Sequence, residues 1–373
     1  MDKIILRILK IGLNIVYFFM KLLPTKNRIV MISRQSNNIP IDFELLRKEL
    51  SKKYEVKCLC KKLEGKEKSG FKERIKYGFH MFTQMYYLAT SRVCILDSYC
   101  PTVSILKHKK KLTIIQIWHS IGTMKRFGYT ALDKEDGNSS DIAKIMNMHK
   151  NYDFVCASSL AYANDLATGF NISEDKVKEY TLPRIDLLND KKYEKEIKNK
   201  IYKKYPELNN KKKNIIYAPT NRKEEEEFSL KLEELVKEFD YSKYNLIIKL
   251  HPLSTIKVDN ENVIFDKEFS TFDFLFIADG LISDYSCILY EAGVRNIPLY
   301  FYCYDIDNYL KTRGIALDYK ELPGYQEKSA KKLVKDLDKK YDMNYLKKFI
   351  KKYVVSSNNC TSKLVEKIVE YMK

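Results

Sequence analysis

The sequence predicts an α/β protein built from two doubly wound, Rossmann-like domains that follow an amphipathic helix. Short apolar runs alternate with stretches of helical periodicity, which indicates parallel sheets covered by helices on both faces. The chain has 373 residues, of which 45% are hydrophobic, so it is long enough to form two separate cores. Its first segment combines a broad apolar face with a narrow stripe of cations.

Residues 1–24 are the first element. Their polar side chains share one face of a helix, at spacings of four, three, four and seven: Lys3, Arg7, Lys10, Asn14 and Lys21. We expect an in-plane membrane helix on an anionic surface, because Lys10 of a spanning helix would lie near mid-bilayer at a cost of about 3 kcal/mol. Packing against the protein's own body and a membrane span are the alternatives. Pro24 ends the helix.

The first large domain is expected at residues 25–205. Its predicted strands are Arg28–Ser33, Glu55–Cys60, Arg92–Asp97, Ile114–Trp118 and Asp153–Ser159. The segment "DFELLRKELSKKY", between the first two strands, has the period of a helix with one apolar face. A polar, Lys-rich stretch from Asp190 to Lys213 predicts the domain boundary.

The second large domain is expected at residues 206–373, where the alternation restarts. Its predicted strands are Asn214–Thr220, Asn245–Pro252, Asn262–Asp266, Gly280–Ser286 and Ile297–Asp305. Two doubly wound halves of this kind place a ligand cleft between them, faced by the carboxyl ends of the strands. The chain has no G-x-G-x-x-G or P-loop sequence, which argues against dinucleotide or Walker-type binding.

The net charge indicates the class of partner, and the cysteine spacing indicates whether a metal is bound. A net charge of +18, from 67 Lys and Arg against 49 Asp and Glu, indicates an anionic partner such as nucleic acid, anionic lipid or a phosphorylated substrate. No RNA-recognition signature with stacking aromatics occurs, so we expect no nucleic-acid partner. The eight cysteines form no C-x-x-C pair, which predicts buried free thiols rather than a zinc site.

A histidine and two cations follow the strand Ile114–Trp118. A neutral imidazole at His119, at the carboxyl end of a parallel strand, has the chemistry to take a proton from a substrate hydroxyl. A structural histidine is the alternative. Gly122 is expected to let the chain turn, and Lys125 and Arg126 are candidates to hold phosphate, with an ordinary surface loop as the alternative.

Polar side chains also follow strands of the second domain. In "APTNR", Thr220 and Asn221 are suited to hydrogen-bond a phosphate and Arg222 to bind it bidentately, and a helix cap is the alternative. His251, in "KLHP", is a second strand-end histidine.

The segment "SDYS" marks a change from strand to helix. Its backbone N–H groups, with the hydroxyls of Ser283 and Ser286, form a candidate anion site. Ordinary capping by Asp284 or Ser286 is compatible with it.

Taken together, these segments resemble one known family. The segments are Trp118–Gly128, Leu182–Asp186, Ala218–Arg222, Lys249–Pro252, Ser283–Asp305, Arg313–Gly314, Asp318–Tyr319 and the terminal "NNCTSKLVEKIV". In order and spacing they resemble the CDP-glycerol glycerophosphotransferase family of teichoic acid synthesis. Three residues depart from its pattern: Cys287 replaces a usual second Ser, Asn221 an aromatic and Glu291 an Asp.

The resemblance implies a GT-B-like architecture, with the acceptor bound by residues 25–205 and the CDP-polyol donor by residues 206–373. It implies a transferase of substituted phosphate groups that moves glycerol phosphate from CDP-glycerol to a hydroxyl of a lipid-linked acceptor, such as an undecaprenyl-diphosphate disaccharide, and releases CMP. His119 would be the base, and His251 would stabilise charge at the donor phosphates. The implied substrate-binding residues are Lys125, Thr220, Arg222, Ser283, Asp284, Ser286, Glu291 and Arg313.

The resemblance also implies a peripheral protein on the cytoplasmic face of a bacterial membrane. The chain length favours a primase or a short-chain transferase. The departures leave CDP-ribitol open as the donor. A GT-B nucleotide-sugar glycosyltransferase is a competing enzyme hypothesis, and a non-enzymatic binder is a competing hypothesis of another class. No cofactor is expected with certainty, a requirement for Mg²⁺ stays open, and so does homo-oligomerisation.

Overall fold

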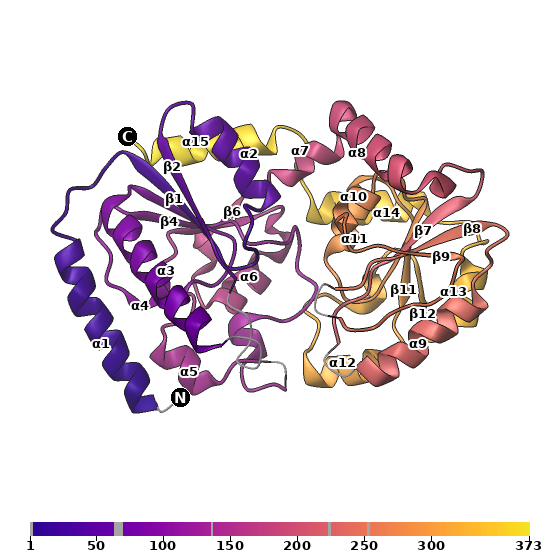
Figure 1. Ribbon diagram of the computed structural model, residues 1–373, viewed down its shortest axis with the longest axis horizontal. Coiled ribbons are helices and arrows are strands. Elements are labelled where there is room, and N and C mark those ends of the chain that lie inside the picture. The colour runs from indigo at the N-terminus through magenta and orange to yellow at the C-terminus, as the bar shows by residue number, and fades with distance from the viewer. Residues whose placement is uncertain (1–2, 63–69, 136, 223–224, 252–253) are drawn as a thin grey trace. The chain divides into compact units, whose positions relative to one another are not determined.

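The protein folds into two compact units, each built around one parallel sheet (Figure 1). The computed structural model describes residues 3–62, 70–135, 137–222, 225–251 and 254–373. The first unit contains residues 1–120, 126–184 and 358–373, and the second contains residues 121–125 and 185–357. Two six-stranded parallel sheets covered by helices confirm the predicted α/β class.

The first sheet has the strand order β2-β1-β3-β4-β5-β6. Its strands are β1 (Arg28–Ser33), β2 (Glu55–Cys60), β3 (Val93–Leu96), β4 (Thr113–Gln116), β5 (Phe154–Ala157) and β6 (Val177–Glu179). Every residue of β1, β3 and β5 is buried, as expected for strands covered on both faces. Sequence reasoning missed β6 because it has three residues, two of them exposed, and so carries no apolar run.

The first and the last helix of the chain both belong to the first unit. They are α1 (Lys3–Met20), α2 (Ile41–Leu50), α3 (Phe71–Thr90), α4 (Pro101–Ile105), α5 (Ser140–Ile145), α6 (Ala163–Phe170) and α15 (Cys360–Glu370). The C-terminal helix α15 packs against α2 (Figure 1) and buries Leu364 and Ile368. The expectation that the second domain runs to residue 373 is therefore wrong, because these apolar side chains complete the first unit.

Helix α1 packs on the first unit through its polar face. Lys10 Nζ donates to a backbone carbonyl of α5 at 2.7 Å, and Asn14 Nδ2 donates to a carbonyl of α4 at 3.0 Å. The Tyr17 hydroxyl is buried and lies 2.8 Å from Nδ1 of His108. Burial lowers the pKa of His108 to about 4, so its neutral ring can accept this hydrogen bond.

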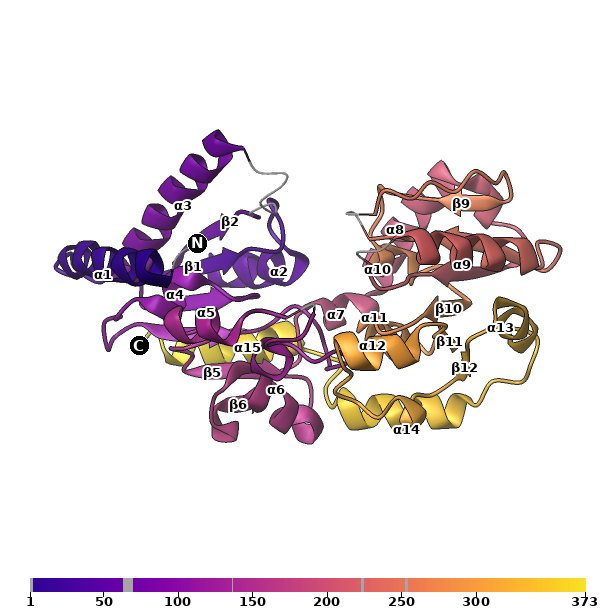
Figure 2. The same cartoon turned by 90° about the horizontal axis from the view of Figure 1, so that it is seen from below.

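The apolar side of α1 is exposed. Helix α1 lies beside α3 (Figure 1 and Figure 2). The exposed apolar side chains include Ile4, Ile8, Leu9, Phe18 and Phe19. The helix thus packs against the protein's own body, the alternative to free binding at a membrane, while its apolar face stays uncovered. Among the helices described, none is both long enough and apolar enough to cross a bilayer.

The second sheet has the strand order β12-β11-β10-β7-β8-β9. Its strands are β7 (Lys213–Tyr217), β8 (Tyr244–Ile248), β9 (Val263–Phe265), β10 (Gly280–Ser283), β11 (Leu299–Tyr302) and β12 (Tyr325–Glu327). This is the dinucleotide-fold order, in which the direction of winding reverses between β7 and β10. The carboxyl ends of those two strands therefore border the crevice where ligands bind in such sheets. Sequence reasoning missed the short edge strand β12, which is only half-buried.

The second unit begins earlier than predicted. Its helices are α8 (Lys191–Lys204), α9 (Glu225–Glu238), α10 (Thr271–Phe274), α11 (Ile288–Val294), α12 (Ile306–Thr312), α13 (Ala330–Asp336) and α14 (Met343–Tyr353), and α7 (Arg184–Leu188) crosses the boundary. The Lys-rich stretch expected as a boundary is α8, which buries Ile197 and Ile201. Glu194 of α8 pairs with Arg295 at 3.1 Å, which helps to hold this helix within the second unit.

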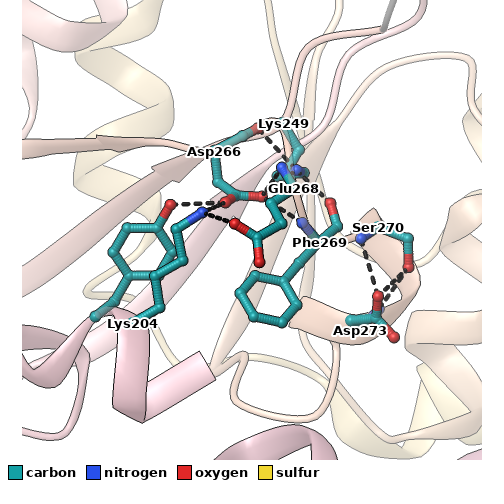
Figure 3. Close-up of polar contacts among 8 residues, drawn as sticks. Lys204, Lys249, Asp266, Glu268, Phe269, Ser270 and Asp273 are labelled. Atoms are coloured by element: carbon teal, nitrogen blue, oxygen red, sulfur yellow. Dashed lines mark hydrogen bonds and ion pairs between the residues drawn. The ribbon is translucent and has the colours of Figure 1, made fainter. Parts of the chain in front are cut away.

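A buried ion pair joins the loops that follow β8 and β9 (Figure 3). Lys249 Nζ donates to Asp266 Oδ1 at 2.7 Å and to the Phe269 carbonyl at 2.5 Å. Lys204 reaches the other carboxylate oxygen of Asp266 at 3.3 Å from the rim. The Asp266 side chain is 0% exposed, against 6% for Lys249 and 37% for Lys204. The lysine of "KLHP" is thus a structural residue beside His251.

We expect Lys249→Ala to lower the free energy of unfolding by about 3–5 kcal/mol, because it leaves the Asp266 carboxylate buried without its main partner. Lys204→Ala is the matched control and should cost much less, because water replaces the exposed ammonium. Urea denaturation of both variants measures the difference. Equal losses of unfolding free energy would show that the buried ion pair contributes no more to stability than the exposed one.

Candidate functional site

In the first unit, the candidate base lies just beyond β4. Trp118 has a φ of 63°, in the left-handed region that bulky residues rarely adopt. Its backbone N–H donates to Gln116 Oε1 at 2.9 Å, and its ring lies 4.1 Å from the His119 ring between centroids. The strained backbone therefore turns the chain at the strand end and delivers His119.

A cluster of aromatic side chains packs against Trp118 at this turn. The ring of Trp118 contacts those of Phe127 and Phe170, each at 5.0 Å between centroids. His149 packs on Phe170 at 4.9 Å and is buried, and burial lowers its pKa to about 3. His149 is thus a neutral structural histidine, whereas His119 remains half-buried.

A backbone carbonyl fixes the tautomer of His119. The Nδ1 atom lies 2.9 Å from the carbonyl oxygen of Asp97, at the end of β3. Because a carbonyl only accepts, Nδ1 carries the proton and Nε2 carries the lone pair. The amide of Gln35 lies 3.4 Å from the same Nδ1. The ring is therefore held in the form that a general base requires, with Nε2 as its basic atom.

Asp97 was not singled out from the sequence. Its buried carboxyl group accepts hydrogen bonds from Ser33 Oγ at 2.6 Å and Ser98 Oγ at 2.8 Å, and burial raises its pKa to about 6. These bonds join the ends of β1 and β3 and hold the carbonyl that orients His119. Its place at the end of a predicted strand was the signal that could have found it.

The segment 121–125, directly after His119 and Ser120, belongs to the second unit. A Cβ added to Gly122 would lie 2.3 Å from the ring of Tyr290, whose hydroxyl donates to the Thr123 carbonyl at 2.8 Å. Gly122 is therefore needed for a close approach to Tyr290. The chain also bends at Gly122, as expected, although this glycine is not among those with a positive φ.

Lys125 ends this segment inside the candidate donor site. It forms an antiparallel bridge with Ile315 and is half-buried. Loss of solvent lowers the pKa of Lys125; Asp284 opposes the shift, while Arg222 and Arg313 add to it. Among the described residues, no carboxylate forms an ion pair with its ammonium group. The site thus holds a cation suited to a ligand phosphate.

Arg222 forms a buried clamp beside Lys125. Its Nε donates to Asp305 at 2.8 Å, and a terminal nitrogen donates to Asp284 at 2.9 Å. The other terminal nitrogen donates to the Thr220 carbonyl at 2.9 Å. Burial opposes the charge, but the two carboxylates raise the pKa of Arg222 above its ordinary value. The guanidinium therefore already has its partners within the protein, and Asp305 is a site residue that sequence reasoning did not assign.

Thr220 lies at the switch point between β7 and β10. Its backbone N–H donates to both carboxylate oxygens of Asp284, at 2.9 and 3.0 Å. Its buried Oγ1 has no hydrogen-bond partner within the part of the chain that the structure describes. Because an unsatisfied buried hydroxyl is costly, Thr220 is suited to bind a ligand oxygen.

The serines of "SDYS" are engaged in the fold. Ser283 Oγ donates to the Ala218 carbonyl at 2.8 Å and joins the ends of β10 and β7. Ser286 Oγ accepts from the Ile288 N–H at 3.5 Å and precedes Cys287, the N-cap residue of the seven-residue helix α11. The capping interpretation is wrong, because the N-cap residue of α11 is Cys287 rather than Asp284 or Ser286, and the anion site remains a prediction.

The other predicted residues occupy separate places. Glu291 is buried in α11, and Arg313 follows α12 near Lys125. His251 is exposed, three residues beyond β8. The structure brings Lys125, Thr220, Arg222 and Asp284 together in the second unit, whereas His119 belongs to the first. Within the described ranges, no three His, Cys, Asp or Glu side chains are grouped to hold a metal ion.

Comparison with known proteins identifies the family. Residues 15–370 match the model of the CDP-Glycerol:Poly(glycerophosphate) glycerophosphotransferase family. The chain belongs to this family. The match spans almost the whole sequence and confirms the resemblance drawn from its motifs, so this polyol phosphotransferase acts with a CDP-polyol donor.

Relatives of this phosphotransferase include enzymes for two polyols. It is 31% identical over 328 residues to a teichoic acid ribitol-phosphate primase of Bacillus spizizenii, covering 84% of this chain and 82% of the relative. It is 31% identical over 259 residues to a teichoic acid glycerol-phosphate primase of Bacillus subtilis, covering 67% and 65%. The chain covers 52% of a poly(ribitol-phosphate) polymerase from B. spizizenii.

Solved structures share the fold of the phosphotransferase. The wall teichoic acid polymerase TagF matches with a TM-score of 0.74 at 20% identity, over 97% of this chain and 94% of that one. A UDP-GlcNAc 2-epimerase from Neisseria meningitidis matches with a TM-score of 0.58 at 14% identity, over 92% and 100%. These likenesses confirm the GT-B-like fold.

Proposed function

We propose that this phosphotransferase moves glycerol phosphate from CDP-glycerol to a hydroxyl of a lipid-linked saccharide and releases CMP. The observation that carries the proposal is the geometry of His119, whose Nδ1 contacts the Asp97 carbonyl at 2.9 Å and leaves the basic lone pair on Nε2. Family membership supports the CDP-polyol donor.

The proposed chemistry is a single displacement at phosphorus. His119 Nε2 takes the proton of the acceptor hydroxyl, whose oxygen attacks the phosphorus that bears glycerol. The bond from that phosphorus to the CMP oxygen breaks, and CMP leaves with the electron pair. Lys125, the Thr220 hydroxyl and His251 stabilise the phosphate charge, and Arg222 holds the surrounding carboxylates in place.

CDP-ribitol is the second candidate donor, and one observation favours it. The ribitol-phosphate primase matches this chain over more of both lengths than the glycerol-phosphate primase does. Both relatives are primases, which supports the addition of a first polyol unit. Glu291, buried in α11, is the residue that we propose lies near the polyol.

The donor is tested by incubating the purified chain with a lipid-linked disaccharide and CDP-glycerol, CDP-ribitol or a UDP-sugar, each alone. We expect CMP release and a product heavier by one glycerol phosphate. A ribitol-phosphate product would show that the donor is CDP-ribitol instead of CDP-glycerol. A series of products, each heavier by one further unit, would show that the enzyme is a polymerase rather than a primase. Turnover of the UDP-sugar alone would overturn phosphotransfer.

We expect His119→Ala to lower kcat by about 10²–10⁴-fold, because it removes the base. CDP-glycerol binding, followed by titration calorimetry, should stay within about twofold of the wild-type value. His251→Ala is the matched control on the donor side and should weaken donor binding instead. A His119→Ala enzyme with near-normal kcat would overturn the assignment of the base.

We also propose that the protein is attached peripherally to the cytoplasmic face of the bacterial membrane. The neighbouring helix α3 also exposes the apolar side chains of Ile75, Phe79 and Phe82. Because polar hydrogen bonds hold α1 on the first unit, its apolar face is presented outward while the helix remains folded. Cations beside this face would meet anionic headgroups.

We expect the double variant Ile8→Ser/Leu9→Ser to weaken binding to phosphatidylglycerol vesicles more than tenfold, since burying each side chain contributes about 1.5–3 kcal/mol. The control Leu230→Ser/Leu310→Ser removes two exposed leucines from the second unit and should leave binding unchanged. Vesicle sedimentation of the full chain compares the two. Equal binding by both variants would contradict attachment through α1.

A further inference from the structure

A groove of about 970 Å³ lies along α1 in the first unit. One wall is α1 itself, and the other includes the end of α5 and Lys107, which lies two residues beyond α4. Lys10 Nζ donates to the last carbonyl of α5 at 2.7 Å, and this hydrogen bond links α1 to α5 within the groove. The groove is part of neither candidate site described above.

The groove is strongly cationic. Six Lys or Arg side chains line it against one carboxylate, and that carboxylate, Asp141, is already paired with Lys3 at 2.5 Å. Arg7, Lys10 and Lys144 have no ion-pair partner within the described ranges. Burial and the charge of Lys150 lower the pKa of Lys10. Such a lining attracts a multiply charged anion.

The same groove has an apolar side. Ile11, Ile15 and Phe18 line it and are each more than half exposed. They continue directly into the outward apolar face of α1. The lining therefore changes from cationic at the seam with the protein to apolar at the outer edge, which matches a ligand with an anionic head and a hydrocarbon tail.

We propose that this groove binds the lipid end of the acceptor, a prenyl-type chain with a diphosphate head. The proposal rests on the proposed function, because it assigns a place to the lipid of the lipid-linked acceptor. A diphosphate carries two adjacent negative charges, which matches cations presented from both walls better than the single charge of a phosphatidylglycerol headgroup. One isolated lipid fits a groove, whereas a bilayer surface requires a broad face.

The test compares the full wild-type chain with Arg7→Gln/Lys144→Gln, which removes one cation from each wall. Neither side chain contributes a hydrogen bond to the fold among the described residues, so both variants should fold. The control Lys110→Gln/Lys111→Gln removes the same charge from exposed residues outside the groove. Farnesyl diphosphate is the soluble probe, and its binding is measured by titration calorimetry.

We expect the groove variant to weaken farnesyl diphosphate binding at least tenfold and the control to stay within twofold. Saturating CDP-glycerol should leave wild-type binding of the probe unchanged. Displacement by CDP-glycerol would place the probe in the donor site and overturn the proposal. Equal weakening in both double variants, matched by equal loss of phosphatidylglycerol-vesicle binding, would also overturn it by indicating a general surface charge effect.

Activity separates this inference from the proposed function. With the lipid-linked acceptor, the groove variant should show a KM raised at least tenfold, whereas CDP-glycerol binding stays at the wild-type value. If the wild-type enzyme transfers glycerol phosphate but does not bind farnesyl diphosphate, the groove assignment fails and the function stands. If the probe binds as expected but no CDP-polyol is used, the groove assignment is retained as a lipid-diphosphate site and the function fails.

Discussion

The buried ion-pair network around Arg222 is the interaction on which the candidate donor site depends. One guanidinium holds two carboxylates, Asp284 at the end of β10 and Asp305 beyond β11, and also binds the carbonyl of Thr220 beyond β7. The Arg222 side chain thus contacts residues at or beyond the carboxyl ends of three neighbouring strands. Removing one partner from such a network leaves a buried charge uncompensated, at a cost of about 3–5 kcal/mol. The network therefore fixes the positions of the Thr220 hydroxyl and of the negatively charged Asp284 carboxylate.

The same network changes the role that Arg222 has in the site. An arginine just beyond a strand end suggests direct phosphate binding, yet its donors are occupied by protein groups. Lys125, from the segment that follows the candidate base, brings a further cation to this site, and the described residues place no carboxylate in an ion pair with it. The segment that links the candidate base to this cation is short, and Gly122 allows it to pack against the ring of Tyr290.

Helix α1 reverses the usual arrangement of an amphipathic helix on a globular protein. Its polar face makes the contacts with the body, through Lys10, Asn14 and Tyr17, and its apolar face is uncovered. Specific hydrogen bonds replace apolar burial as the means of docking. This arrangement leaves cations along the seam, next to exposed apolar side chains, and so creates the groove.

The sequence by itself determined the α/β class, ten of the twelve strands and the polar residues at their ends, including His119, Thr220 and Arg222. It could do so because buried parallel strands are continuous apolar runs, and because side chains beyond their carboxyl ends converge. Two short edge strands carried no such pattern. Only the tertiary structure decided that residues 185–205 join the second unit, that residues 358–373 return to the first, and that Gly122 serves a close approach. Each of these depends on contacts between residues far apart in the sequence, which no local period of apolar residues records.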